Sequence, residues 1–133
     1  MEKMDYKTVL EFIGKYDEEA TRVFNKLQDA DLKAETGILH YGYYSEFERI
    51  EWEYSDEYSI GVRYYNIGYD SYESTALMMP VDILFDDAKI DEWIKSKIDE
   101  ALEKQEQKRK SIEKRQEEKE RQEYERLKEK FGK

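Results

Sequence analysis

The chain has 133 residues, a formal net charge of −10 at neutral pH, no cysteine and one histidine. This composition excludes disulfides within the chain, thiolate nucleophiles, zinc sites of the cysteine type and paired histidine ligands. No run of about 18 apolar residues is present, and acidic residues interrupt the N-terminal segment where a secretion signal needs an apolar stretch, so we expect a cytoplasmic protein.

The negative charge is concentrated in the first two thirds of the chain. Residues 1–87 contain 20 Asp and Glu against eight Lys and Arg, a net charge of −12, whereas residues 88–133 carry +2. Residues 40–87 alone carry −9. Such a charge disfavours direct binding to nucleic acid backbones or to anionic membranes.

The first predicted element is a helix over residues 5–30. Its apolar residues recur at steps of three and four, which places them on one face of a helix. These residues are Val9, Ile13, Tyr16, Ala20, Val23, Phe24 and Leu27. Gly14 weakens a helix by roughly 1 kcal/mol relative to alanine, and Asp17 offers a second helix start, so a break near 15–17 is the alternative.

The next segment alternates apolar and polar residues with a period of two, which is typical of half-buried strands. We expect strands over residues 50–54, 58–65 and 72–79, joined by short turns, and residues 37–44 offer a fourth. Pro80 ends the sheet, because proline cannot donate to a central ladder. The pattern predicts an antiparallel meander of three or four strands.

A second helix is predicted to begin at Asp86 or Asp87, either of which can cap it. Its apolar face is formed by Ile90, Trp93, Ile94, Ile98, Ala101 and Leu102. Beyond about Lys104 this face disappears and charged residues dominate. The sequence therefore predicts an α+β fold, with a compact domain over residues 1–104 and a charged helical extension over residues 105–133.

The sequence contains no recognisable catalytic motif. The chain has no glycine-rich phosphate loop and no nucleophile elbow, and His40 has no evident nucleophilic partner. Paired carboxylates are the one remaining route to a hydrolase or a magnesium site, but acids are so numerous that their pairing carries no specificity. We expect no enzymatic activity, no catalytic residue, no metal site and no cofactor.

The most distinctive feature is the acidic, tyrosine-rich stretch 41–73, which holds nine tyrosines in 33 residues. Tyrosine offers a large contact area at low side-chain entropy, so this stretch suggests a protein-binding face. The other interpretation is that cross-strand tyrosine pairs stabilise the sheet while the acids keep it soluble. The candidate binding residues are Glu46, Glu48, Glu51, Glu53, Asp56, Glu57, Asp70 and Glu73, with Tyr65 and Tyr69 as anchors.

The charge of this face indicates a basic partner, and basic surfaces inside cells commonly belong to proteins that bind nucleic acids. Carboxylates on a sheet would occupy such a surface as phosphates do. The predicted layout consists of a first helix, an acidic tyrosine-rich meander, and the segment MPVDILFDDAKIDEWIKSKIDEALEKQEQKRK, which runs into a Lys- and Glu-rich tail. This layout resembles that of small bacteriophage accessory proteins. These include anti-CRISPR and anti-restriction proteins that imitate DNA. This resemblance of layout and composition implies an inhibitor of host defence.

Two other functions remain open. Tyr124, Leu127 and Phe131 are spaced to form an apolar patch on one helix face, which suggests that the extension mediates oligomerisation of a structural or assembly protein. A small ligand bound between the sheet and the helices by stacking on tyrosines is the third possibility. Arg49 and Arg63 are the only cations of residues 40–87, so an anionic nucleotide suits such a pocket poorly.

Overall fold

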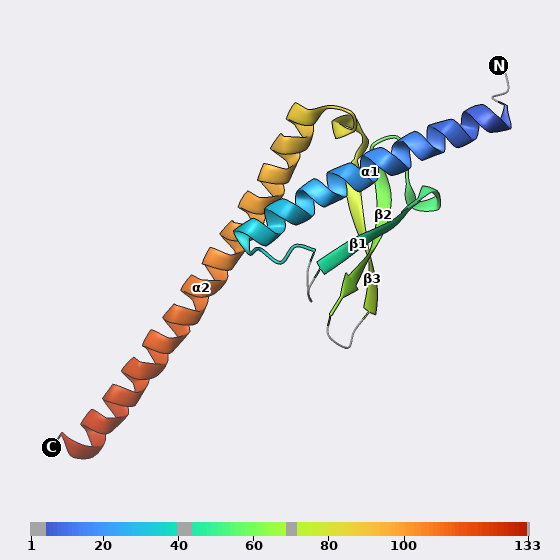
Figure 1. Cartoon of the computed structure of the whole chain (residues 1–133). Coiled ribbons are helices and arrows are strands. Elements are labelled where there is room, and N and C mark those ends of the chain that lie inside the picture. Colours follow the sequence, from blue (N-terminus) through green and yellow to red (C-terminus); the bar gives the residue numbers. More distant parts are fainter. Residues whose placement is uncertain (1–4, 40–43, 69–71, 133) are drawn as a thin grey trace. The chain divides into compact units, whose positions relative to one another are not determined.

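The computed structural model of the chain describes residues 5–39, 44–68 and 72–132 (Figure 1). The chain has an N-terminal helix, a three-stranded antiparallel sheet and a long C-terminal helix, which confirms the predicted α+β layout. The elements in chain order are α1 (Tyr6–Ala34), β1 (Tyr44–Glu51), the short 3-10 helix η1 (Trp52–Tyr54), β2 (Ser59–Ile67), β3 (Tyr72–Pro80), the short 3-10 helix η2 (Val81–Ile83) and α2 (Asp87–Phe131). The chain divides into two compact units, Met1–Ile98 and Asp99–Lys133, whereas the sequence pattern placed the division after residue 104.

Helix α1 is one uninterrupted helix of 29 residues. Asp5 caps its start by accepting a hydrogen bond from the Thr8 backbone N–H at 2.7 Å. The alternative of a break near residues 15–17 is therefore wrong. A single glycine destabilises the helix by less free energy than the packing of its continuous apolar face contributes. The helix also continues beyond residue 30 to Ala34, where Glu35 adopts a left-handed conformation with φ of 53°.

The sheet has three strands in the order β1-β2-β3, each antiparallel to its neighbour. The second and third predicted strands lie close to β2 and β3, but the first prediction, residues 50–54, was wrong in position. Strand β1 ends at Glu51, and residues 52–54 form η1 instead, closed by a hydrogen bond from the Ser55 N–H to the Trp52 carbonyl at 3.1 Å. A bulge between Phe47 and Arg49 also shifts the alternation, which a strict period of two does not anticipate. Of the optional strand 37–44, only Tyr44 belongs to β1, and residues 40–43 lie outside the described part.

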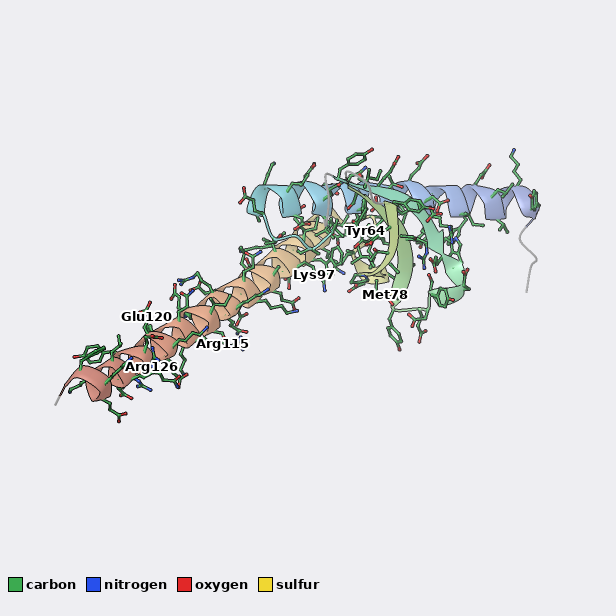
Figure 2. All side chains as sticks on the ribbon, turned by 90° about the horizontal axis from the view of Figure 1, so that it is seen from below. Tyr64, Met78, Lys97, Arg115, Glu120 and Arg126 are labelled. Atoms are coloured by element: carbon green, nitrogen blue, oxygen red, sulfur yellow. The ribbon has the colours of Figure 1, made fainter. Side chains whose placement is uncertain are left out.

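The core forms where α1 crosses one face of the sheet (Figure 1). Phe24 of α1 packs on Phe47 of β1 and Tyr64 of β2, with ring centroids 6.3 and 5.1 Å away. Tyr64 lies between the sheet and α1 in the second view (Figure 2). Burying each large apolar side chain of this kind contributes about 1.5 to 3 kcal/mol relative to leaving it exposed. Among the described residues, the fully buried apolar side chains are Ala20, Val23, Phe24, Leu27, Leu39, Val62, Met79 and Ile90.

The first turns of α2 belong to the same unit as the sheet and contact α1. Ile90 and Ile94 are buried in the common core. On the surface above them, Arg22 of α1 donates to Asp87 at 2.7 Å, and Lys26 lies 3.4 Å from Asp91. These pairs are exposed and contribute little free energy, so the buried isoleucines provide most of the attachment.

In the second unit, the described side chains of residues 99–132 are all exposed except that of Ala101, which is partly buried. Exposed ion pairs run along this segment, such as those of Arg109 with Glu106 and Glu113, both at 2.5 Å. The labelled side chains of Arg115, Glu120 and Arg126 stand out from the helix in Figure 2. Pairs at these spacings stabilise an isolated helix by a few tenths of a kcal/mol each.

Candidate protein-binding surface

One end of the sheet brings together the end of β1, η1, the turn into β2, the end of β3 and η2. Backbone hydrogen bonds tie these segments: the Val81 N–H donates to the Tyr58 carbonyl and the Asp56 N–H to the Ser59 carbonyl, both at 2.9 Å. Four exposed acids lie on these segments, and we call them the acidic end: Glu53, Asp56, Glu57 and Asp82. Residues 50–62 contain no Lys or Arg, so this end gathers negative charge without a local counterion from its own segment.

The carboxylate of Asp56 shapes the turn at the acidic end. Its Oδ1 atom accepts hydrogen bonds from the backbone N–H groups of Tyr58 at 2.8 Å and Ser59 at 2.9 Å. These two donors, Tyr58 first, hold the pKa of Asp56 below its ordinary value, because they stabilise the ionised form. Asp56 therefore remains charged at neutral pH and fixes the backbone that carries Glu57.

Four aromatic rings meet beside the acidic end, and we call them the aromatic cluster: Phe12, Tyr16, Trp52 and Phe85. Tyr16 is at the centre, with ring centroids 4.7 Å from Phe12, 6.0 Å from Trp52 and 5.4 Å from Phe85. The cluster is far from buried, since Phe12 is 47% exposed, Trp52 40% and Phe85 50%. Contiguous exposed aromatic surface of this kind marks interaction sites on soluble proteins.

Phe85 occupies its place in the cluster with an unusual backbone, at φ of 64°. A left-handed conformation costs a residue with a side chain roughly 1 to 2 kcal/mol. The conformation is supported by Glu19, which is buried and accepts a hydrogen bond from the Phe85 N–H. Arg22 holds the same carboxylate through two hydrogen bonds of 2.7 and 3.0 Å. The Arg22 hydrogen bond first, and the Phe85 N–H as well, lower the pKa of Glu19.

The strand acids expected to form a binding face differ in exposure and in pairing. Glu46 is exposed on the sheet face opposite α1, beside its cross-strand neighbour Tyr65. Glu51 on the same face is only 4% exposed and pairs with Arg63, which also donates to the Ser74 hydroxyl at 2.8 Å. Buried and paired in this way, Glu51 is not part of an exposed surface.

Glu48 also pairs with an arginine of the same strand. It is at the bulge of β1 and pairs with Arg49 at 2.5 Å. Because Glu48 and Glu51 are each matched by an arginine, the middle of the sheet carries little net charge. The two arginines that appeared few in the sequence thus lie directly beside strand acids of the predicted binding set.

The other predicted binding residues are divided between the two ends of the sheet. Glu53, Asp56 and Glu57 lie together at the acidic end. Glu73 is exposed near the start of β3, at the opposite end, where it pairs in register with Asn66. Tyr69 and Asp70 lie outside the described residues. Within the described residues, three acids of the predicted set are thus neighbours at one end of the sheet.

Sequence reasoning missed Asp82 and the aromatic cluster. The sequence pattern places Tyr16 on the apolar face of the first helix and Trp52 in a strand. It gives no role to Phe85, which lies between two predicted elements. One sequence feature could have pointed to Phe85: it is the only aromatic residue of the acidic segment 81–86, just before α2. The contact that unites these rings joins segments distant in sequence, which periodicity cannot reveal.

An open groove of about 610 Å³ lies between α1 and the first turns of α2. Its lining is formed by Lys26, Asp29, Ala30, Lys33, Ala34, Asp91, Ile94, Lys95 and Ile98. This lining differs from the tyrosine-lined pocket between sheet and helices that was considered for a small ligand. The groove is mixed in charge and has an aliphatic floor.

Within residues 5–39, 44–68 and 72–132, no three His, Asp or Glu side chains are arranged to hold a metal ion. Across the same residues, no helix is both long and apolar enough to cross a membrane. Comparison of the chain with protein-family models, curated proteins and solved structures found no match.

Proposed function

We propose that the protein is a non-enzymatic, cytoplasmic binding protein that engages a basic, nucleic-acid-binding surface of another protein through its acidic end. The observation that carries the proposal is the gathering of Glu53, Asp56, Glu57 and Asp82, all exposed, at one end of the sheet. In this proposal the target is a host protein and the binding inhibits it, as a bacteriophage anti-defence protein would.

Electrostatics support the acidic end as the contact. Carboxylates held on a fixed backbone present negative charge as the phosphates of a nucleic acid do. Complementary charge accelerates the encounter and selects against acidic partners. Surface charges are screened over about 8 Å at physiological salt, so binding of this type weakens as salt is added.

The test compares three full-length chains as baits in bacterial lysate at low and high salt. The charge-reversed bait carries Glu53→Lys, Glu57→Lys and Asp82→Lys, and leaves Asp56 in place because it holds the turn. A matched control carries Glu117→Lys, Glu118→Lys and Glu120→Lys, which changes the net charge equally on the exposed second unit.

We expect the wild type and the control to retain a nucleic-acid-binding protein that high salt releases, and the charge-reversed bait to lose it. The captured protein should also lose its nucleic acid when the wild type is added. Equal capture by all three baits, or no effect on nucleic acid binding, would contradict the proposal.

A second candidate function is self-association through the C-terminal helix. Tyr124, Leu127 and Phe131 are 67%, 42% and 74% exposed and share one helix face by their spacing. A helix with an exposed apolar stripe gains free energy when a partner covers it. Replacing all three with serine in the full chain should convert an oligomer to a monomer in analytical ultracentrifugation. A wild type that sediments as a monomer at high concentration would exclude this function.

A further inference from the structure

The aromatic cluster already contacts one cation of the chain itself. The Lys15 ammonium lies 5.9 Å from the centroid of the Phe85 ring. Aromatic ring faces attract cations through their quadrupole, by about 0.5 to 1 kcal/mol at exposed sites. Lys15 is exposed and its long side chain can move, so a cation from a partner can take its place over Phe85.

We infer that the aromatic cluster is the docking site for an arginine side chain of the basic partner, an inference that rests on the proposed function. Trp52 and Phe85 each meet Tyr16 edge-on, at interplanar angles of 70° and 87°. Both retain substantial exposed surface beyond this contact. An incoming planar group therefore finds two partly exposed rings that contact Tyr16.

A carboxylate adjoins the aromatic cluster in the chain. Glu53 directly follows Trp52 in η1, is exposed, and belongs to the acidic end. A guanidinium stacks on aromatic faces and donates to a carboxylate from its rigid fork at the same time. An ammonium is a strongly hydrated point charge without a stacking plane. The combination of rings and acid therefore favours arginine over lysine at equal charge.

The position of Phe85 is maintained by the fold. Its left-handed backbone is tied to α1 by the hydrogen bond to Glu19, and Arg22 holds that carboxylate in place. A ring fixed in advance loses little conformational entropy on binding. The cluster is thus preorganised for recognition, because its rings are already in contact before a partner binds.

The experiment measures binding of the full-length chain to two probe peptides, nona-arginine and nona-lysine, by isothermal titration calorimetry at one ionic strength. We expect the wild type to bind nona-arginine roughly two- to fivefold more tightly than nona-lysine, the margin of one exposed cation–π contact. The variant with Trp52→Leu and Phe85→Leu should bind both peptides equally. A control with Tyr44→Leu, which is 48% exposed on the sheet face opposite α1, should keep the preference.

A second variant does not touch the rings. Lys15→Gln removes the internal cation and should raise the affinity for nona-arginine more than that for nona-lysine. Equal binding of the two peptides by the wild type would overturn the inference while leaving the acidic end as a general basic contact. Failure of both peptides to bind would overturn the proposed function as well. An unchanged preference in the Trp52→Leu and Phe85→Leu variant would place the arginine site elsewhere.

Discussion

The buried carboxylate of Glu19 in α1 accepts a hydrogen bond from the backbone N–H of Phe85, which follows it by 66 residues. This bond ties the connector between η2 and α2 to the first helix. The carboxylate also receives two hydrogen bonds from the Arg22 guanidinium, which donates a third to Asp87. Glu19 thus links the helix packing of the first unit to the position of the aromatic cluster.

The stabilisation from Glu19 should be lost in acid. The folded chain lowers the pKa of Glu19 below its ordinary value of 4.5, first through the Arg22 hydrogen bond. The unfolded chain therefore binds this proton more readily, and the free energy of unfolding falls as pH decreases from about 4.5 through the folded pKa. Glu19→Gln cannot lose this contribution, so the stability gap between wild type and variant should narrow below pH 4.5. Urea unfolding from pH 7 to pH 3 measures the gap, and a constant gap would contradict the assignment.

Asp31 should be among the most costly polar side chains to remove. It is 1% exposed and accepts hydrogen bonds from the N–H groups of Ile38 at 2.9 Å and Leu39 at 2.8 Å. Asp31→Ala leaves these buried donors unpaired, and we expect a loss of roughly 2 to 4 kcal/mol in the free energy of unfolding. Asp29→Ala, at an exposed position of the same helix, should change it by less than about 0.5 kcal/mol. Similar losses for the two variants would contradict the role of Asp31.

Replacing Gly14 with alanine should stabilise the folded protein. It lies within the continuous helix α1, and a Cβ atom added there would meet no heavy atom within 4 Å. Alanine restricts the unfolded chain and favours the helix, so Gly14→Ala should raise the free energy of unfolding by about 0.5 to 1 kcal/mol. Thermal unfolding followed by circular dichroism measures this. A lower midpoint would show that residue 14 needs the freedom of glycine.

Removal of the chain after Lys104 should leave the first unit folded. The described residues 105–132 are exposed throughout, so their loss removes no core side chain. We expect the truncated chain to keep the near-ultraviolet circular dichroism of Trp52 and the core aromatics, and to unfold cooperatively. A truncated chain without a cooperative transition would show that the second unit is needed for folding.

The regular elements were predictable because their periodicity reports burial directly. The α1 face with Ala20, Val23, Phe24 and Leu27 is the helix side of the core. Strand β2 alternates as expected, with Ile60, Val62 and Tyr64 buried on that side. The start of α2 at Asp87 was also correct. These features depend only on neighbouring residues.

The features that were missed depend on contacts between distant segments. The bulge between Phe47 and Arg49 and the 3-10 turn at Trp52 both interrupt the alternation of β1, and a strict period of two does not anticipate them. Arg63 neutralises Glu51 only because the register of β1 and β2 makes them neighbours on one face. Counting charges along the chain therefore overestimated the net charge of the strands. It did not reveal that Asp82 lies at the same end of the sheet as Glu53, Asp56 and Glu57.

The order of the strands has a consequence for folding kinetics. Each strand pairs only with its neighbour in the chain, so the ladder assembles from two local hairpins that close short loops. Low contact order of this kind favours fast formation. The connection of α1 to the start of α2, through Arg22 and Asp87, spans 65 residues and carries a larger loop-closure cost. We expect the sheet to form early in the transition and the docking of the two helices to limit the rate.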